Sequence, residues 1–136
     1  QRDSYRIPIS SPFLAQMMPR ISGAIKLHGT ELGLEPQSFT IAHQIEKQLL
    51  KPVIQQSKAI KQLELEIFNL ALADNDTHTL ADKIDQLANA KRKLSHIQAG
   101  CIHDIFVNIS ATDKEKLRIF FNKNKNLMLN RHHFIF

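Results

Sequence analysis

The hydrophobic positions of this 136-residue chain are most regular between Pro36 and Ala73, where they predict one long helix. An apolar stripe recurs there at steps of three and four residues, with one double step: Ile41, Ile45, Leu49, Val53, Ile60, Leu63, Ile67 and Leu70. Such spacing places side chains on one face of an α-helix. About 38 residues at a rise of 1.5 Å each give a rod of roughly 57 Å. A rod of that length does not fit the core of a compact domain, so we expect an extended fold.

The same helix carries a second apolar stripe on roughly the opposite face. Its members are Ile54, Leu65, Phe68 and Leu72, and Lys58 and Lys61 take the heptad positions between Ile54 and Leu65. A helix with one apolar face needs one partner, whereas this helix has two faces to cover. Other helices of the chain or a second subunit can cover the second stripe. Alternatively, its apolar area and its lysines bind clients or a partner protein, and these six residues are the candidate site.

A shorter helix is predicted before the long one. Ser11 and Pro12 resemble an N-cap followed by proline in the first turn, and Pro19 predicts a kink or break. Gly33 stands where a helix ends in the left-handed conformation. The apolar positions of this helix are Leu14, Met18, Ile21, Ile25 and Leu32, with His28 in the same stripe. Pro52, inside the long helix, predicts a bend because the apolar period continues across it.

A third helix is predicted from Thr79 to Asn108, after a turn at Asp74-Asn75-Asp76. Thr77 or Thr79 can cap it, and Thr79 with Asp82 approximates a capping box. Its single apolar stripe is Leu80, Ile84, Leu87, Leu94, Cys101 and Ile105, with Lys91 and Gln98 in the intervening positions. One apolar face and a short connection predict an antiparallel hairpin with the long helix.

Ser110 or Thr112 is predicted to cap a fourth helix, which carries Leu117, Phe120 and Phe121. Residues 1–11 are interpreted as an irregular leader, and residues 122–136 carry no clear pattern. The fold class is therefore all-α: one domain over residues 1–136, built on a long helical hairpin flanked by shorter first and fourth helices.

Composition excludes several classes of function. No apolar run approaches the roughly 18 residues of a membrane span. The chain contains no nucleophile beside a plausible base, no phosphate-binding loop and no converging carboxylates, so we do not expect an enzyme. The net charge of +5 is spread along the chain. The basic run at residues 91–93 wraps around a helix without interleaved aromatic residues, and we expect no nucleic-acid binding.

Two histidines pair with carboxylates at helical spacing. His28 with Glu31, and His43 with Glu46, are each three positions apart and share a helix face. Together the four residues are a candidate site for a transition metal such as Zn, Co, Ni or Cu; otherwise we expect no cofactor. The alternative for His28 is a histidine packed in the core. Cys101 lies in an apolar stripe, which favours a packing role, and a single cysteine forms no disulfide within the chain.

Two segments resemble the Spy/CpxP family of periplasmic stress proteins. Residues 32–37, Leu-Gly-Leu-Glu-Pro-Gln, are similar to the Leu-Gly-Leu-Thr-Pro-Glu-Gln segment with which that family begins its second helix. Residues 109–117, Ile-Ser-Ala-Thr-Asp-Lys-Glu-Lys-Leu, stand where the family carries a second such motif. Glu35 replaces the threonine, Ser38 stands where glutamine is expected, and the second copy lacks the proline and the glutamine.

The resemblance implies a Gram-negative periplasmic protein, with a signal peptide or anchor removed before Gln1, and a cradle-like homodimer. Family members include ATP-independent chaperones for unfolded or partly folded proteins, inhibitors of an envelope sensor kinase, and proteins that sense or buffer heavy metals. We expect a chaperone or envelope-stress adaptor. The alternatives are a metal-sensing or metal-resistance domain and a structural adaptor with one dedicated partner. Neither the branch of the family nor the natural client follows from the sequence.

Overall fold

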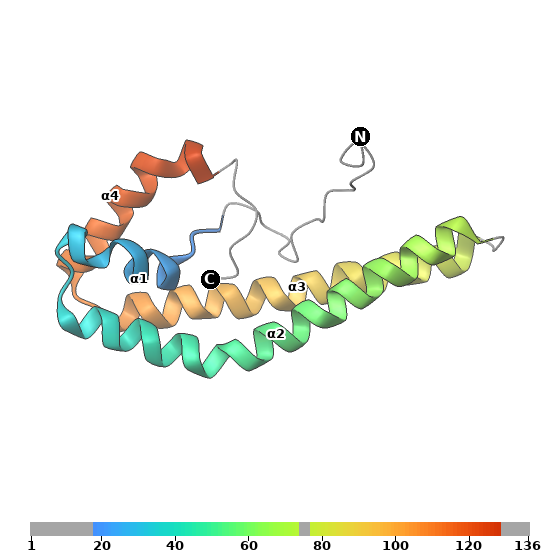
Figure 1. The fold of residues 1–136 in the computed structure, drawn as a ribbon, viewed down its shortest axis with the longest axis horizontal. Helices are drawn as coiled ribbons and strands as arrows, with labels where there is room; N and C mark the ends of the chain where they lie inside the picture. The colour runs from blue at the N-terminus through green and yellow to red at the C-terminus, as the bar shows by residue number, and fades with distance from the viewer. Residues whose placement is uncertain (1–17, 74–76, 129–136) are drawn as a thin grey trace, which may run out of the picture.

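The computed structural model describes residues 18–73 and 77–128, which form four helices and no strand. The helices are α1 (Ile21–Leu32), α2 (Pro36–Leu72), α3 (Thr77–Asn108) and α4 (Ala111–Met128). The predicted all-α class is confirmed. In Figure 1, α2 and α3 lie side by side as a long rod, and α1 and α4 gather at one end of it. The predicted leader, the predicted start of the first helix at Ser11 and Pro12 with Leu14, the turn at residues 74–76 and residues 129–136 of the predicted tail lie outside the described residues.

The observed boundaries follow the proline and cap signals, with two corrections. α1 begins at Ile21, directly after Pro19 and Arg20, and α2 stays helical through Pro52, with a bend visible in its teal-to-green part (Figure 1). α3 already begins at Thr77, so Thr77 and Thr79 both lie inside the helix and neither is its cap. α4 continues to Met128, so residues 122–128, for which no structure was predicted, are helical.

α2 and α3 are antiparallel, as three contacts along them show. Val53, Ile60 and Leu94 form a small buried cluster between the two helices. The amide of Gln56 donates to the carbonyl of Ala90 at 3.0 Å. Further along, Lys83 Nζ lies 2.8 Å from Glu66 Oε1. Residues further along α2 therefore contact residues nearer to the start of α3.

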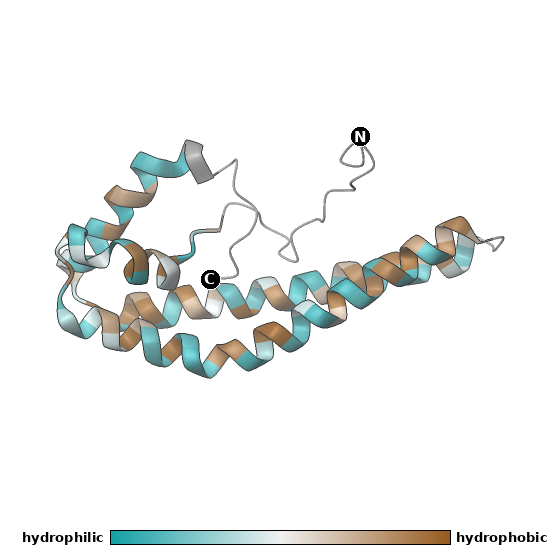
Figure 2. Cartoon of the chain, in the orientation of Figure 1, coloured by the Kyte–Doolittle hydropathy of each residue, from teal (hydrophilic) through white to brown (hydrophobic). Residues whose placement is uncertain are grey.

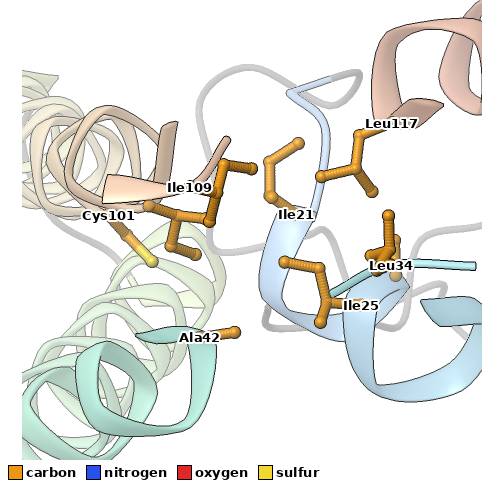
Figure 3. Packing of buried hydrophobic residues seen from close by; sticks show 9 residues of the cluster. Ile21, Ile25, Leu34, Ala42, Cys101, Ile109 and Leu117 are labelled. Atoms are coloured by element: carbon orange, nitrogen blue, oxygen red, sulfur yellow. The ribbon is translucent and has the colours of Figure 1, made fainter. Parts of the chain in front are cut away.

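The larger core lies where all four helices meet. It contains residues from each of them: Ile21, Ala24, Ile25, Leu34, Ala42, Cys101, Ile105, Ile109 and Leu117 (Figure 3). Gly29 of α1 also belongs to this end, where a Cβ atom would lie only 2.6 Å from the ring of Phe39. The absence of a side chain at Gly29 lets α1 approach α2 closely. α1 and α4 consequently cover one end of the rod, and among residues 18–73 and 77–128 the other end consists of α2 and α3 alone.

α1 ends in a Schellman motif, which sets the direction of the connection to α2. Gly33 has φ 71° and ψ 38°, the left-handed conformation that glycine adopts without strain. Its N–H donates to the carbonyl of Thr30 at 3.1 Å, and the N–H of Leu34 donates to the carbonyl of Gly29 at 3.0 Å. Leu34 is then buried in the core. The predicted helix end at Gly33 is confirmed.

The first turn of α4 joins the first turn of α2. The hydroxyl of Ser110 accepts the N–H of Asp113 at 3.1 Å, which confirms Ser110 as the cap of α4. The buried carboxylate of Asp113 accepts the N–H of Glu35 at 2.9 Å and the hydroxyl proton of Ser38 at 2.5 Å, both on Oδ2. Lys116 Nζ donates to the carbonyl of Gly33 at 2.9 Å. The two segments quoted above as similar to family motifs are therefore in direct contact.

Candidate functional site

The six candidate residues of the second stripe all lie on α2, and we call them the α2 stripe. Their apolar members are open to solvent: Ile54 is 39% exposed, Leu65 53%, Phe68 49% and Leu72 74%. Lys58 and Lys61 are exposed as well. Neither α1 nor α4 covers the stripe within the described part of the chain. The structure thus brings the six residues together on one solvent-facing side of a single helix.

The stripe stays open because α3 occupies a different side of α2. The buried residues Val53 and Ile60 point toward α3, and Leu65 lies five positions beyond Ile60, which is 140° around the helix axis. Figure 2 shows apolar residues recurring along α2 and α3 as far as the end remote from α1 and α4. Of the four described helices, only α2 and α3 are packed together at that end, and one of the two apolar faces of α2 is exposed there.

Leu50 on α2 and Ile84 on α3 are exposed, although neither was predicted to be open to solvent. Leu50 precedes Ile54 by four positions and is also exposed, so it extends the α2 stripe by one turn. The sequence contains this i, i+4 spacing between Leu50 and Ile54. Leu50 directly follows Leu49, which belongs to the packed stripe, and it was not assigned to the second stripe. Ile84 of α3 was predicted to be part of the stripe packed on α2, and this prediction is wrong: its side chain is 49% exposed.

The physical reason for the exposure of Ile84 lies in its neighbour. Lys83 forms an ion pair with Glu66 of α2 and is partly buried by it. The hydrogen bonds from Lys83 and from Gln62 lower the pKa of the Glu66 carboxyl. Because Ile84 is 100° further around α3 than Lys83, it cannot share the same contact. Lys83 lies seven positions before Ala90 and shares the side of α3 that packs on α2, so Ile84 faces away from that contact.

The four candidate metal ligands do not form one site. His28 Nδ1 lies 2.9 Å from Glu31 Oε1 on α1, and the ring of His28 lies 4.9 Å from that of Phe120 on α4. Within residues 18–73 and 77–128, no three histidine, cysteine or acidic side chains are grouped so that they could hold a metal ion. His43, on α2, is exposed. His28 and Glu31 are a local pair at the packing of α1 on α4.

Glu46 has partners of its own. Its carboxylate accepts the hydroxyl proton of Ser22 at 2.8 Å and a hydrogen bond from Lys26 Nζ at 2.9 Å, and it thereby joins α2 to α1. Burial alone would raise its pKa. The hydrogen bonds from Lys26 and Ser22, together with the positive charges of Lys26 and His43, outweigh burial and lower the pKa of Glu46. The contacts of this carboxylate are those of a link between two helices.

Cys101 is packed in the larger core, on the side of α3 that faces α1. Burial, with smaller contributions from the negative charges of Asp104 and Glu46, raises the pKa of its thiol to about 11. The thiolate, which is the form that binds metals and attacks disulfides, is therefore scarce near neutral pH. These properties agree with the predicted packing role of Cys101.

None of the helices in residues 18–73 and 77–128 combines the length and the apolar character needed to cross a membrane. Comparison of the chain with protein-family models, with curated proteins and with solved structures found no match. The α2 stripe and its surroundings are accordingly the basis on which function is assigned.

Proposed function

We propose that this chain is an ATP-independent chaperone or envelope-stress adaptor of the Spy/CpxP type, acting in the periplasm by holding exposed apolar segments on the α2 stripe. The observation that carries the proposal is the exposure of Leu65, Phe68 and Leu72 on one face of a helix whose other face is packed. Large apolar side chains grouped on the surface of a small protein are typical of sites that bind other proteins. The clients are unfolded or partly folded proteins, or the exposed segment of an envelope sensor.

The chemistry of the stripe supports a holding function rather than catalysis. Apolar side chains provide area for many different client side chains, and Lys58 and Lys61 interact with acidic groups and attract negatively charged clients from a distance. No step needs a nucleotide, since binding and release follow from the affinity alone. The resemblance further implies a cradle-like homodimer in which α2 and α3 form the long arm, and sedimentation velocity tests that part of the proposal.

Light scattering of a chemically denatured model protein, diluted into metal-free buffer, tests the function. We expect suppression of aggregation near an equimolar ratio, and a loss of suppression in Phe68→Glu, which places a charge in the middle of the apolar part of the stripe. Ile119→Glu is the matched control, because Ile119 is similarly exposed but lies on α4. Circular dichroism confirms that both variants are folded.

Three outcomes overturn this reading. An absence of suppression by the wild-type chain removes generic chaperone activity and assigns the α2 stripe to one dedicated partner. Equal losses in Phe68→Glu and Ile119→Glu place the client elsewhere or in several places at once. Suppression that survives Phe68→Glu, in a folded variant, likewise excludes the α2 stripe as the binding surface.

A further inference from the structure

The α2 stripe is interrupted by charge in its middle. Leu65 follows Ile54 by eleven positions, which is roughly 16 Å along a helix at 1.5 Å per residue. Lys58 and Lys61 lie between them, on the same side, and both are exposed. A bound segment that reaches the apolar groups at both Ile54 and Leu65 must therefore pass over two ammonium groups.

The two lysines have no ion-pair partner among the described residues. Glu66 directly follows Leu65 on α2. It is bound by Lys83 at 2.8 Å and by Gln62 at 3.3 Å. Its carboxylate is held on the side of α2 that faces α3. Neither ammonium group is held in an ion pair within the described part of the chain, and an apolar segment laid over them would remove their water without supplying a charge in its place.

Resting on the proposed function, we propose that the α2 stripe selects segments of one pattern: carboxylates placed between two groups of apolar side chains about 16 Å apart. The apolar groups of such a segment contact Ile54 on one side and Leu65 and Phe68 on the other. Its carboxylates then meet Lys58 and Lys61, so that the charges that lose water gain partners. A uniformly apolar segment lacks this compensation, and a segment with lysines in its middle is repelled.

The same arrangement disfavours a second copy of this chain as the occupant. If a second α2 packed antiparallel with its Leu65 against Ile54, the lysines of the two copies would face each other at the centre of the contact. Like charges in close contact oppose association. The charge pattern of the stripe is thus complementary to an acidic segment and not to itself.

Three fluorescent helical peptides of 22 residues test the proposal with the full chain. The first carries two glutamates between two apolar groups on one face. The second contains the same residues, with the glutamates moved to the ends and the apolar groups joined. The third is the first with lysine in place of glutamate. We expect anisotropy titrations to show the first peptide binding on the order of tenfold more tightly than either of the others, since two exposed charge pairs together contribute about that factor.

The double variant Lys58→Glu/Lys61→Glu should reverse this order and prefer the lysine peptide. The matched control, Lys93→Glu/Lys123→Glu, changes the net charge equally at exposed positions on α3 and α4 and should keep the wild-type order. Equal binding of the first two peptides, no binding of either, or an unchanged order in the Lys58/Lys61 variant overturns the proposal. So does self-association that Lys58→Glu strengthens and that blocks the peptides, because the occupant is then a second copy.

The aggregation assay tests the proposed function separately from the peptide titrations. If the wild-type chain suppresses aggregation and Phe68→Glu abolishes the effect, but the peptides show no pattern preference, the chaperone surface stands and the selectivity is wrong. If the peptide order is as expected but no aggregating client is held, the α2 stripe recognises a dedicated acidic partner and has no general chaperone activity.

Discussion

The carboxylate of Asp113 accepts a hydrogen bond from the hydroxyl of Ser38 at 2.5 Å, although the two residues are 75 positions apart in the chain. The same carboxylate oxygen accepts the N–H of Glu35, directly before α2 begins. Asp113 therefore supplies from α4 the acceptor that a capping side chain would normally supply from the helix itself. This contact holds the start of α2 and the start of α4 in one fixed arrangement at the larger core.

We expect Asp113→Ala to lower the free energy of unfolding by about 2–3 kcal/mol, because the hydroxyl of Ser38 and the N–H of Glu35 both lose a charged, buried acceptor. Urea unfolding followed by circular dichroism measures it. The exposed Asp82→Ala is the control and should stay within about 0.5 kcal/mol of wild type. A double-mutant cycle with Ser38→Ala should show strong non-additivity. Additive losses would mean that the hydrogen bond contributes little.

Two glycines inside helices should respond in opposite directions to the same substitution. A Cβ on Gly29 would lie 2.6 Å from the Phe39 ring, so Gly29→Ala must displace that ring and is expected to destabilise by about 1–2 kcal/mol. Gly100, on α3, has nothing within 4 Å of the added atom. Gly100→Ala should stabilise by about 0.5–1 kcal/mol, since alanine favours a helix over glycine. Thermal unfolding of the two variants gives the comparison, and shifts of the same sign would contradict the close packing of α1 on α2.

The link between α1 and α2 through Glu46 should be sensitive to pH. Its folded-state pKa is lowered from the ordinary 4.5, so its contribution is complete above that value and is lost as the pH falls through the lower, folded-state pKa. Glu46→Gln should therefore cost about 1 kcal/mol of unfolding free energy at pH 7 and almost nothing in strong acid. Glu31→Gln, at an exposed carboxylate, is the control. A deficit of Glu46→Gln that does not shrink on acidification would show that packing, not charge, makes the link.

The helices themselves could be predicted from local patterns. The three- and four-residue spacing determined α2, and the signals at Pro36, Gly33 and Ser110 are residue preferences that act within one turn of the chain. Such preferences need no knowledge of the rest of the fold. The open face of α2 also followed from the sequence as a second stripe, because its residues repeat at the same helical period.

Contacts between helices could not be predicted in the same way. The partner of Lys83 is Glu66, which lies on the other helix. The role of Asp113 depends on residues that precede it by 75 positions or more. The proposed metal site required His28 and His43 to approach across α1 and α2, but Glu46 is instead bound by Lys26 and Ser22. The partners of Asp113 and of Glu46 are thus long-range polar contacts, which the local spacing does not specify.

The last prediction concerns the reactivity of the Cys101 thiol, which follows from its burial and its raised pKa. With a thiol pKa of about 11, the thiolate fraction rises about tenfold for each pH unit between 7.5 and 9.5, and the alkylation rate with iodoacetamide should rise with it. In the urea-unfolded chain the thiol returns to a pKa near 8.5, so at pH 8 the folded chain should react at least about a hundredfold more slowly. Non-reducing gels should accordingly show no disulfide-linked dimer. Rapid alkylation of the folded chain at pH 8 would mean that the contact between α1 and α3 opens readily, and the larger core would then be less firmly closed than its packing indicates.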